Sequence, residues 1–420
     1  MAGWIKDLSS LWRKTTRALK LRIRTSVYQP YLKLLVRRVS RRRPIKVMFY
    51  VNNLSMWKSD KLLMLLKKDK VFEPFIVSYL YPSDSPSTKK EREESIFSHF
   101  HAMGIKVLSG FDYKTNSLIP VNSLNPDIVF YPQPYKKYRL REMPRNYLLS
   151  YIPYCFEMEV EEHFYNSSYQ NICWKLFVPS KLHKELKTKY NYNHGANVVV
   201  AGNPLADYFF DGHTPSDEAW PVKDSGLKRI IWAPHHSIQS QDWLDYSNFL
   251  EIADVMLEIA KEYKDRVQFV FKPHPMLKEK LYKNDSWGPE KTDQYYETWA
   301  TMPNTRFADG NYVDLFMTSD ALIHDCSSFT AEYLYVNKPV MYLTRKDKID
   351  YFNAFADACF QVHYHGCSKS EITSFIEDVI KGVDPLKEKR TLFIREQIIP
   401  RNRESVAETM YHELCSIYAE

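Results

Sequence analysis

Short apolar runs of strand length alternate with segments of helical period along most of this chain, and this alternation constrains the fold more than any other feature. One series begins with PIKVMFYVNN and continues through WKSDKLLMLLKKD and FEPFIVSYL. A second series starts near Ile172 and runs from CWKLFVPS through YSNFLEIADVMLEIAKEY to KPVMYL. Strands that alternate with helices form a parallel sheet covered by helices. The sequence therefore predicts an α/β protein with two Rossmann-like, doubly wound domains and an interdomain cleft.

The length of 420 residues also favours two domains, because a single hydrophobic core rarely grows this large. We expect an N-terminal domain over residues 44–170 and a C-terminal domain over residues 171–400. A periodic apolar pattern predicts a final helix within residues 401–420. Residues 1–43 form a separate arm in this interpretation.

The arm carries the basic charge of the protein. Residues 1–43 contain 13 Lys or Arg and one acid, and subtracting this +12 from the chain's +7 leaves −5 for the remainder. Its first turns place apolar residues at helical spacing: Trp4, Ile5, Leu8, Leu11 and Trp12. A basic helix with an apolar face that includes tryptophan is typical of a segment lying on an anionic membrane.

A second apolar set in the arm comprises Tyr31, Leu34, Leu35 and Val39. A solvated helix, or one packed on a domain, is the alternative interpretation of the arm. Nucleic-acid binding is disfavoured because the rest of the chain is acidic. The chain also lacks a long apolar run and the apolar core of a signal peptide. We therefore expect peripheral binding at the cytoplasmic face of the cell membrane.

Polar residues follow four of the predicted strands in the second series, RIIWAP, VQFVFKP, TRFAD and ALIHD. Because ligands of parallel α/β sheets bind at the carboxyl ends of the strands, these residues are the candidate binding site. They are His235, His236, Ser237, Lys272, His274, Pro275, Asp309, Asn311, Asp325, Ser327 and Ser328, together with Glu332 in the helix that follows the last strand.

Ser327 and Ser328 stand where a helix is expected to begin, near Phe329. Free backbone N–H groups and hydroxyls at a helix start can bind an anion without glycine. Helix capping is the alternative, with a serine at the N-cap and Glu332 following it. The chain has no glycine-rich phosphate loop, so the serines are the better candidates for a phosphate cradle.

His274 lies between two prolines at a strand end, where an imidazole can donate to a phosphate oxygen or act as an acid. One ring of the pair His235 and His236 is expected to point away from the site. No D-x-D sequence occurs, and the six cysteines form no C-x-x-C pair. We therefore expect a metal-independent site without cofactors, in a reducing compartment.

Several of these segments together resemble one known family. FVFKPHP followed by SDALIHDCSSFTAEYLYVNKPVMYL, together with WAPHHS and LFVPS…VVVAGNPLADYF, is similar to the CDP-glycerol glycerophosphotransferases, the teichoic-acid primases and polymerases. The resemblance covers roughly residues 172–345. It implies a GT-B fold whose final helix crosses back to the N-terminal domain.

The resemblance also implies a substrate pair. The donor would be a cytidine diphosphate-linked alditol such as CDP-glycerol, held mainly by the C-terminal domain, with diphosphate contacts from His274, Ser327 and Ser328. The N-terminal domain would bind a lipid-linked or surface-glycan acceptor for a teichoic-acid, capsule or O-antigen-type polymer.

The chain departs from the family pattern at two places. Cys326 replaces the tyrosine of the family's DYSS sequence, and no WHGTP motif supplies a base histidine. The corresponding strand end offers Glu157, Glu159 and Glu161, and we predict Glu157 or a neighbour as the base that deprotonates the acceptor. The alternative is that these glutamates begin a solvated helix.

The sequence thus predicts a glycerophosphotransferase-like enzyme, with Glu157 and His274 as catalytic residues. A GT-B glycosyltransferase that uses a nucleotide sugar is the alternative enzyme. A catalytically inactive binding module that scaffolds glycan enzymes is the alternative from a different class. An oligomer is compatible with the sequence.

Overall fold

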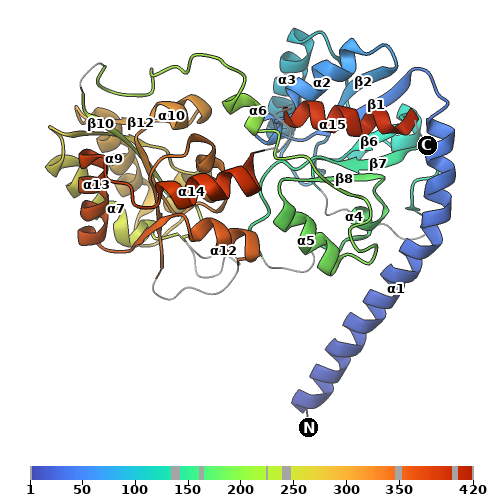
Figure 1. Cartoon of the computed structure of the whole chain (residues 1–420), viewed down its shortest axis with the longest axis horizontal. Helices are drawn as coiled ribbons and strands as arrows, with labels where there is room; N and C mark the ends of the chain where they lie inside the picture. Colours follow the sequence, from blue (N-terminus) through green and yellow to red (C-terminus); the bar gives the residue numbers. More distant parts are fainter. Residues whose placement is uncertain are drawn as a thin grey trace. The chain divides into compact units, whose positions relative to one another are not determined.

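The computed structural model describes residues 2–133, 142–159, 165–223, 226–238, 247–345, 352–399 and 405–418, without the side chains of residues 2–15, 17 and 18. The chain divides into two compact units (Figure 1). The N-terminal unit comprises Met1–Glu157, Glu161–Asp207 and Pro400–Glu420, and the C-terminal unit comprises Met158–Val160 and Tyr208–Ile399.

The N-terminal unit is built on a parallel sheet of seven strands in the order β3-β2-β1-β6-β7-β8-β9. The strands are β1 Ile45–Val51, β2 Phe72–Ser78, β3 Lys106–Leu108, β6 Ile128–Phe130, β7 Leu148–Tyr151, β8 Lys175–Val178 and β9 Val198–Val200. The helices include α2 Asp60–Lys68, α3 Pro86–Ala102, α4 Ser168–Ile172 and α5 Lys181–Tyr190. A small antiparallel pair, β4 Phe111–Asp112 and β5 Ser117–Leu118, lies outside this sheet.

The C-terminal unit has a second parallel sheet, in the order β12-β11-β10-β13-β14-β15. Its strands are β10 Lys228–Ala233, β11 Val267–Phe271, β12 Thr305–Phe307, β13 Ala321–His324, β14 Val340–Leu343 and β15 Tyr364–Gly366. Its helices include α7 Phe249–Glu262, α8 Leu277–Tyr282, α9 Gly288–Thr301, α10 Val313–Thr318, α11 Ser327–Glu332, α12 Ala354–Phe360, α13 Lys369–Lys381 and α14 Lys387–Phe393. The two parallel sheets confirm the predicted α/β class.

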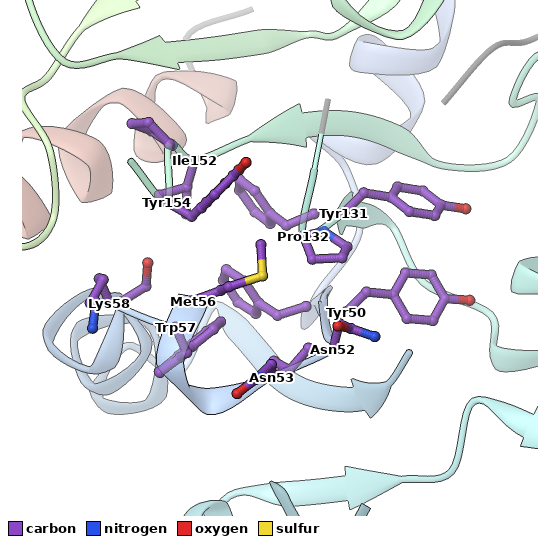
Figure 2. A pocket seen from close by; sticks show the side chains of 15 residues that line it. Tyr50, Asn52, Asn53, Met56, Trp57, Lys58, Tyr131, Pro132, Ile152 and Tyr154 are labelled. Atoms are coloured by element: carbon purple, nitrogen blue, oxygen red, sulfur yellow. The ribbon is translucent and has the colours of Figure 1, made fainter. Parts of the chain in front are cut away.

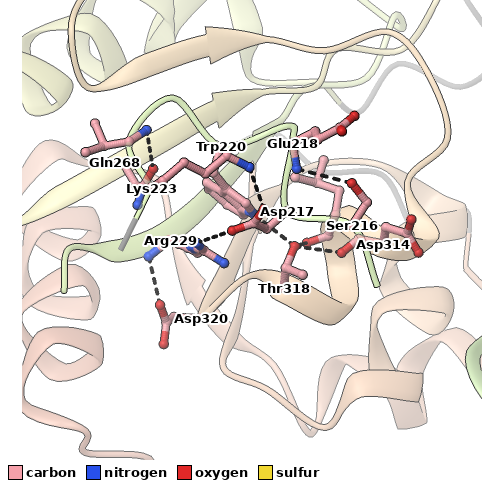
Figure 3. Close-up of polar contacts among 12 residues, drawn as sticks. Ser216, Asp217, Glu218, Trp220, Lys223, Arg229, Gln268, Asp314, Thr318 and Asp320 are labelled. Atoms are coloured by element: carbon pink, nitrogen blue, oxygen red, sulfur yellow. Dashed lines mark hydrogen bonds and ion pairs between the residues drawn. The ribbon is translucent and has the colours of Figure 1, made fainter. Parts of the chain in front are cut away.

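The predicted domain boundary between residues 170 and 171 is wrong. β8 and β9 extend the N-terminal sheet beside β7, so the apolar series that begins near Ile172 does not begin a new domain. Figure 3 shows how the segment after Asp207 is held on the C-terminal unit. The buried Trp220 indole donates to the Thr318 hydroxyl at 2.8 Å. These contacts agree with a boundary after Asp207.

Helix α1, Ala2–Val39, is not an independent arm along its whole length. Its second half packs in the N-terminal unit, where Tyr28 is buried and its hydroxyl donates to the Pro144 carbonyl at 2.7 Å. Leu35 and Val39, which belong to the second apolar set of the arm, are buried in the protein, as the alternative of a helix packed on a domain expects. The predicted face formed by the side chains of Trp4 to Trp12 lies outside the described side chains.

The final helix α15, Val406–Cys415, belongs to the N-terminal unit and packs against α2. The Asp207 carboxylate accepts hydrogen bonds from the backbone N–H groups of Val406 and Ala407, both at 2.8 Å. A carboxylate at this helix start satisfies donors that have no partner within the helix. None of the described helices is both long and apolar enough to cross a membrane.

Residues 276–302 contain the helices α8 and α9. The buried residues of α9 are Thr292, Tyr295, Tyr296 and Trp299, which share one helical face. Aromatic residues at this spacing in YYETW were the signal for this helix, and the neighbouring glycine and proline obscured it.

Candidate functional site

The four strands that end in polar residues are immediate neighbours in the C-terminal sheet. Their order is β12-β11-β10-β13, and all of them run parallel. The residues that follow them therefore lie along one carboxyl edge, as the sequence predicts. This edge is the candidate donor site.

Three histidines meet at this edge. His235 and His236 follow β10, and His274 follows β11. Ring centroids are 4.2 Å apart for His236 and His274, and 5.0 Å apart for His235 and His274. The prediction that one ring of the histidine pair points away is therefore wrong, because both rings lie against His274.

Backbone hydrogen bonds determine the tautomers of two of these rings. The Met276 N–H donates to His274 Nδ1 at 3.1 Å, and the Ser237 N–H donates to His235 Nδ1 at 3.2 Å. A ring nitrogen that accepts a hydrogen bond from an amide carries no proton, so in the neutral ring the proton lies on Nε2. Both rings are therefore arranged to donate through Nε2–H.

The surroundings keep these imidazoles neutral. Burial is the main reason that the pKa of His274 is lowered to about 3, and the neighbouring His236, Lys272 and Lys280 contribute in the same direction. Burial is also the main reason that the pKa of His235 lies well below its usual value. Two neutral N–H donors close to a lysine favour an anionic ligand such as a phosphate group.

Three histidines grouped in this way could also bind a metal ion, since one ligand atom from each lies within 4.8 Å of the others. Metal binding uses an imidazole nitrogen that has a free lone pair. In His235 and His274, Nδ1 accepts a backbone N–H and Nε2 carries the proton. The hydrogen bonds therefore favour an anion over a cation at this cluster.

Asp325 holds the backbone next to the histidine cluster through hydrogen bonds. Its buried carboxylate accepts from the His235 N–H at 2.5 Å, the Asn248 N–H at 2.7 Å and the Ser247 hydroxyl at 2.9 Å. Burial raises its pKa to about 6, although these hydrogen bonds act in the opposite direction. Asp325 therefore positions the His235 loop. Ser237 is also buried, with its hydroxyl 3.0 Å from His235 Nδ1.

Helix α11 begins at Ser327, two residues earlier than expected. Cys326 is the N-cap residue and makes no capping bond with its side chain. Its thiol, whose pKa burial raises, donates to the Ala233 carbonyl at 3.3 Å. Neither serine is an N-cap, so the capping alternative does not account for them. Both hydroxyls lie half-buried in the first turn.

The remaining predicted residues differ in exposure. Lys272 is buried, which lowers its pKa, while Asp309 favours its charged form. Pro275, Asp309 and Asn311 are exposed. Glu332 is buried and accepts a hydrogen bond from the Tyr312 hydroxyl at 2.8 Å, so the structure gives it a partner within the protein.

Glu157, the predicted base, belongs to the N-terminal unit. Its carboxylate is 2.7 Å from the Lys187 ammonium, and both side chains are almost fully buried. The His183 Nε2 lies 3.1 Å from the Glu157 carbonyl oxygen. Glu157 is therefore not part of a solvated helix start. Glu159 pairs with Phe352 in an isolated β-bridge, and Glu161 lies outside the described residues.

Lys187 is the partner that the sequence analysis missed. It lies one turn after His183 on α5, and both side chains are buried. A lysine on the same helical face as a buried histidine is unusual, because lysine is rarely buried without a partner. In the sequence, the position of Lys187 one turn after His183 was therefore the sign that this lysine could be buried with an acidic partner.

Comparisons with known proteins agree with this architecture. Residues 158–362 match the model of the CDP-Glycerol:Poly(glycerophosphate) glycerophosphotransferase family. A 155-residue segment is 28% identical to the teichoic acid poly(ribitol-phosphate) polymerase of Bacillus spizizenii. This segment is 35% of the chain and 22% of that relative, so the match spans about a fifth of the relative's length.

Two solved structures show the fold. A variant of the wall teichoic acid polymerase TagF is similar with a TM-score of 0.56 and 12% identity, over 98% of this chain and 97% of that one. The UDP-GlcNAc 2-epimerase of Neisseria meningitidis is similar with a TM-score of 0.57 and 15% identity, over 89% of this chain and 99% of that one. These likenesses agree with the predicted GT-B type of fold.

Proposed function

Because residues 158–362 match the model of the CDP-glycerol:poly(glycerophosphate) glycerophosphotransferase family, we propose that this protein is an alditol-phosphate transferase. It moves glycerol phosphate, or a related alditol phosphate, from a CDP-linked donor to a lipid-linked or surface-glycan acceptor. The polymer is of the teichoic-acid, capsule or O-antigen type. The relative from Bacillus spizizenii, which is named for a ribitol-phosphate polymer, supports this substrate class.

The observation that carries the proposal is the convergence of His235, His236 and His274 at the ends of two neighbouring strands. Two of these rings present Nε2–H donors, and the Lys272 side chain comes from the same strand end. A diphosphate needs several donors and a positive charge in a partly dehydrated setting, where such bonds are strongest. The cluster supplies both.

In the proposed reaction, an acceptor hydroxyl attacks the phosphorus that carries the alditol. A bond forms between the acceptor oxygen and this phosphorus, and the bond to the bridging oxygen of the diphosphate breaks. The electron pair leaves with CMP, and the hydroxyl proton passes to a base. The histidine N–H groups and Lys272 stabilise the charge that develops on the leaving phosphate.

We also propose that the reaction needs no metal ion. The support is the tautomer arrangement, in which His235 and His274 offer protons at Nε2 and not lone pairs. Dialysis against EDTA should leave donor turnover within about twofold of the untreated rate. A loss of turnover that Mg²⁺ or Zn²⁺ restores would show that the histidine cluster binds a metal.

Membrane association at the cytoplasmic face belongs to the same proposal. Helix α1 leaves Leu19, Ile23 and Val27 more than half exposed, at 58, 52 and 56%. These residues recur every fourth position, so they form one stripe along the helix. Lysines and arginines neighbour this stripe in the sequence. Such a helix can lie on an anionic membrane and bring the enzyme to a lipid-linked acceptor.

A nucleotide-sugar glycosyltransferase is the second candidate, because solved structures of similar fold act on UDP-GlcNAc. Incubation with CDP-glycerol, CDP-ribitol and common nucleotide sugars separates the two functions. The proposal expects release of CMP from the CDP-alditols. Turnover with nucleotide sugars alone would favour the second candidate. Binding of the donors without any turnover would favour a catalytically inactive binding module.

A further inference from the structure

The N-terminal unit has cavities at both edges of its sheet. The pocket in Figure 2 follows strands β1, β6 and β7 at the carboxyl edge, where parallel α/β sheets bind their ligands. A second cavity lies at the opposite edge, between helix α1 and the segments 173–174 and 192–197, which directly precede β8 and β9. We call it the amino-edge groove. The volume between its walls is about 1470 Å³, part of which is open to solvent.

Hydrogen bonds hold the walls of the amino-edge groove in place. The Asn193 amide donates to the Asn197 Oδ1 at 2.7 Å, and the Asn197 amide in turn donates to the Cys173 carbonyl at 2.8 Å. On the other side, the Gln29 amide donates to the Asn171 carbonyl at 3.4 Å, and α1 packs on α4. The groove is therefore formed by the protein itself, so little ordering is left to be done when a ligand binds.

The α1 side of the groove carries two cations. Lys33 and Arg37 are both exposed and lie one turn apart in the lining. Like charges at this spacing repel each other and disfavour a helix. An anion between them replaces this repulsion with two attractions. The other walls include His194 and Trp174, and tryptophan is typical of side chains at a membrane interface.

The same helix places an apolar side chain beside these cations. Leu34 is 61% exposed. At about 100° per residue, it falls on the face of the exposed stripe of α1, and Lys33 and Arg37 both fall on one flank of that face. A free phosphate would contact the cations alone, whereas a phospholipid would also cover Leu34 and the stripe. A ligand with an anionic headgroup and an apolar tail therefore fits this surface best.

We propose that the amino-edge groove binds the phosphodiester headgroup of an anionic membrane lipid between Lys33 and Arg37, with the acyl chains on the side of the stripe. The inference rests on the membrane association proposed for α1, and it adds a defined site that selects the lipid headgroup. The groove lies at the sheet edge opposite to the one where substrates are expected. The lipid therefore anchors the enzyme and is not its acceptor.

A short-chain lipid tests the site without a membrane. Dihexanoyl-phosphatidylglycerol, kept below its critical micelle concentration, would be titrated into the full-length protein by calorimetry. Dihexanoyl-phosphatidylcholine and inorganic phosphate form separate arms. We expect saturable binding of the phosphatidylglycerol and at least about tenfold weaker binding of the other two. Equal affinity for inorganic phosphate would identify a free-phosphate site, and equal affinity for the phosphatidylcholine would identify an apolar contact. Either result would overturn the proposal.

Paired variants of α1 locate the binding. Lys33→Gln/Arg37→Gln removes the cations of the groove. The control Lys20→Gln/Arg38→Gln removes the same charge from exposed positions on the opposite flank of the stripe. We expect the groove variant to weaken phosphatidylglycerol binding by at least about tenfold, because hydrogen bonds to charged groups contribute at least this much. The control should bind like the wild type. Equal affinities in the two variants would contradict the proposal.

The headgroup of phosphatidylglycerol contains glycerol phosphate, so His274→Ala tests whether the donor site binds it. We expect this variant to bind the lipid like the wild type. Binding that is lost in His274→Ala and kept in the groove variant would place the lipid in the donor site and overturn the inference. Failure of the lipid to bind, with CDP-alditol turnover intact, would contradict the groove alone. Absence of CDP-alditol turnover, with lipid binding intact, would contradict the proposed function alone.

Discussion

The Glu157 carboxylate and the Lys187 ammonium form a buried ion pair, with 2.7 Å between the two atoms. Lys187 also lies over the Tyr165 ring, with its nitrogen 4.9 Å from the ring centroid. Burial lowers the pKa of Lys187, whereas Glu157 favours its charged form. The charge of the residue predicted to be the base is therefore already compensated within the N-terminal unit.

Breaking this pair should affect stability more than catalysis. Removing one partner leaves an uncompensated buried charge, which typically costs about 3–5 kcal/mol. We expect Lys187→Met to lower the unfolding free energy by this amount and the double variant Glu157→Gln/Lys187→Met to recover part of it. Urea unfolding followed by circular dichroism measures both effects.

The same pair tests the predicted role of Glu157 in catalysis. If Glu157 only stabilises the fold, a folded Glu157→Gln enzyme should keep its kcat within about tenfold, since a general base typically contributes 10²–10⁴-fold. A properly folded variant whose kcat falls by more than a hundredfold would identify Glu157 as the base.

His274 should determine donor affinity. Its Nε2–H is arranged to donate to an ionised phosphate, and such a bond is worth about 1.5–3 kcal/mol, or roughly 10- to 150-fold in affinity. We expect His274→Ala to weaken CDP binding by this factor in calorimetry. His213→Ala is the matched control, because His213 pairs with Asp314 outside the candidate site. Equal affinities for the two variants would remove His274 from the donor site.

The exposed stripe on α1 should determine membrane binding. Replacing Leu19, Ile23 and Val27 with glutamine removes the apolar area that the membrane would cover, so partitioning should fall by at least about tenfold. Co-sedimentation with vesicles containing phosphatidylglycerol measures this, and vesicles of phosphatidylcholine alone test the role of charge. The control replaces exposed Val383 and Leu392 with glutamine. Equal loss in the control, or none in the stripe variant, would argue against a membrane-bound α1.

Buried neutral histidines should make the fold sensitive to acid. Burial lowers the pKa of His183 and of His363 to about 3 in the folded protein, against an ordinary value of 6.5. The unfolded chain therefore binds protons that the folded chain does not, so stability falls as the pH drops from 6.5 toward 3. By pH 5 each histidine should cost about 2 kcal/mol.

Unfolding midpoints at pH 5, 6 and 7 measure this dependence. His363→Asn should make the dependence shallower by about one proton, because the variant has no group to titrate at this position. A wild-type protein that is equally stable at pH 5 and pH 7 would contradict the account.

The sequence was most informative where its periodicity was strong. The edge that brings together His235, His236 and His274 follows from four strand ends, because parallel strands place their carboxyl ends on one side. The boundary near residue 170 was misplaced because β8 has the same apolar pattern whichever sheet it joins. Only tertiary pairing decides between the two sheets.

Side-chain partners were harder to predict than strand ends. Asp325 appeared to be a ligand of the donor, yet its carboxylate accepts three hydrogen bonds from the protein itself. Glu157 appeared to be an open carboxylate, and its partner Lys187 lies on a helix 30 residues later. Contacts of this kind depend on side-chain directions, which a local pattern does not determine.

The most direct test of the central claim is a donor panel assayed with the full-length enzyme and a lipid-linked glycan acceptor. CDP-glycerol, CDP-ribitol, UDP-glucose and UDP-N-acetylglucosamine would be supplied singly, with product formation followed by mass spectrometry. The account predicts that the acceptor gains the mass of an alditol phosphate, that CMP is released, and that His274→Ala suppresses the transfer. Addition of a sugar from a UDP donor, with no transfer from either CDP-alditol, would contradict it.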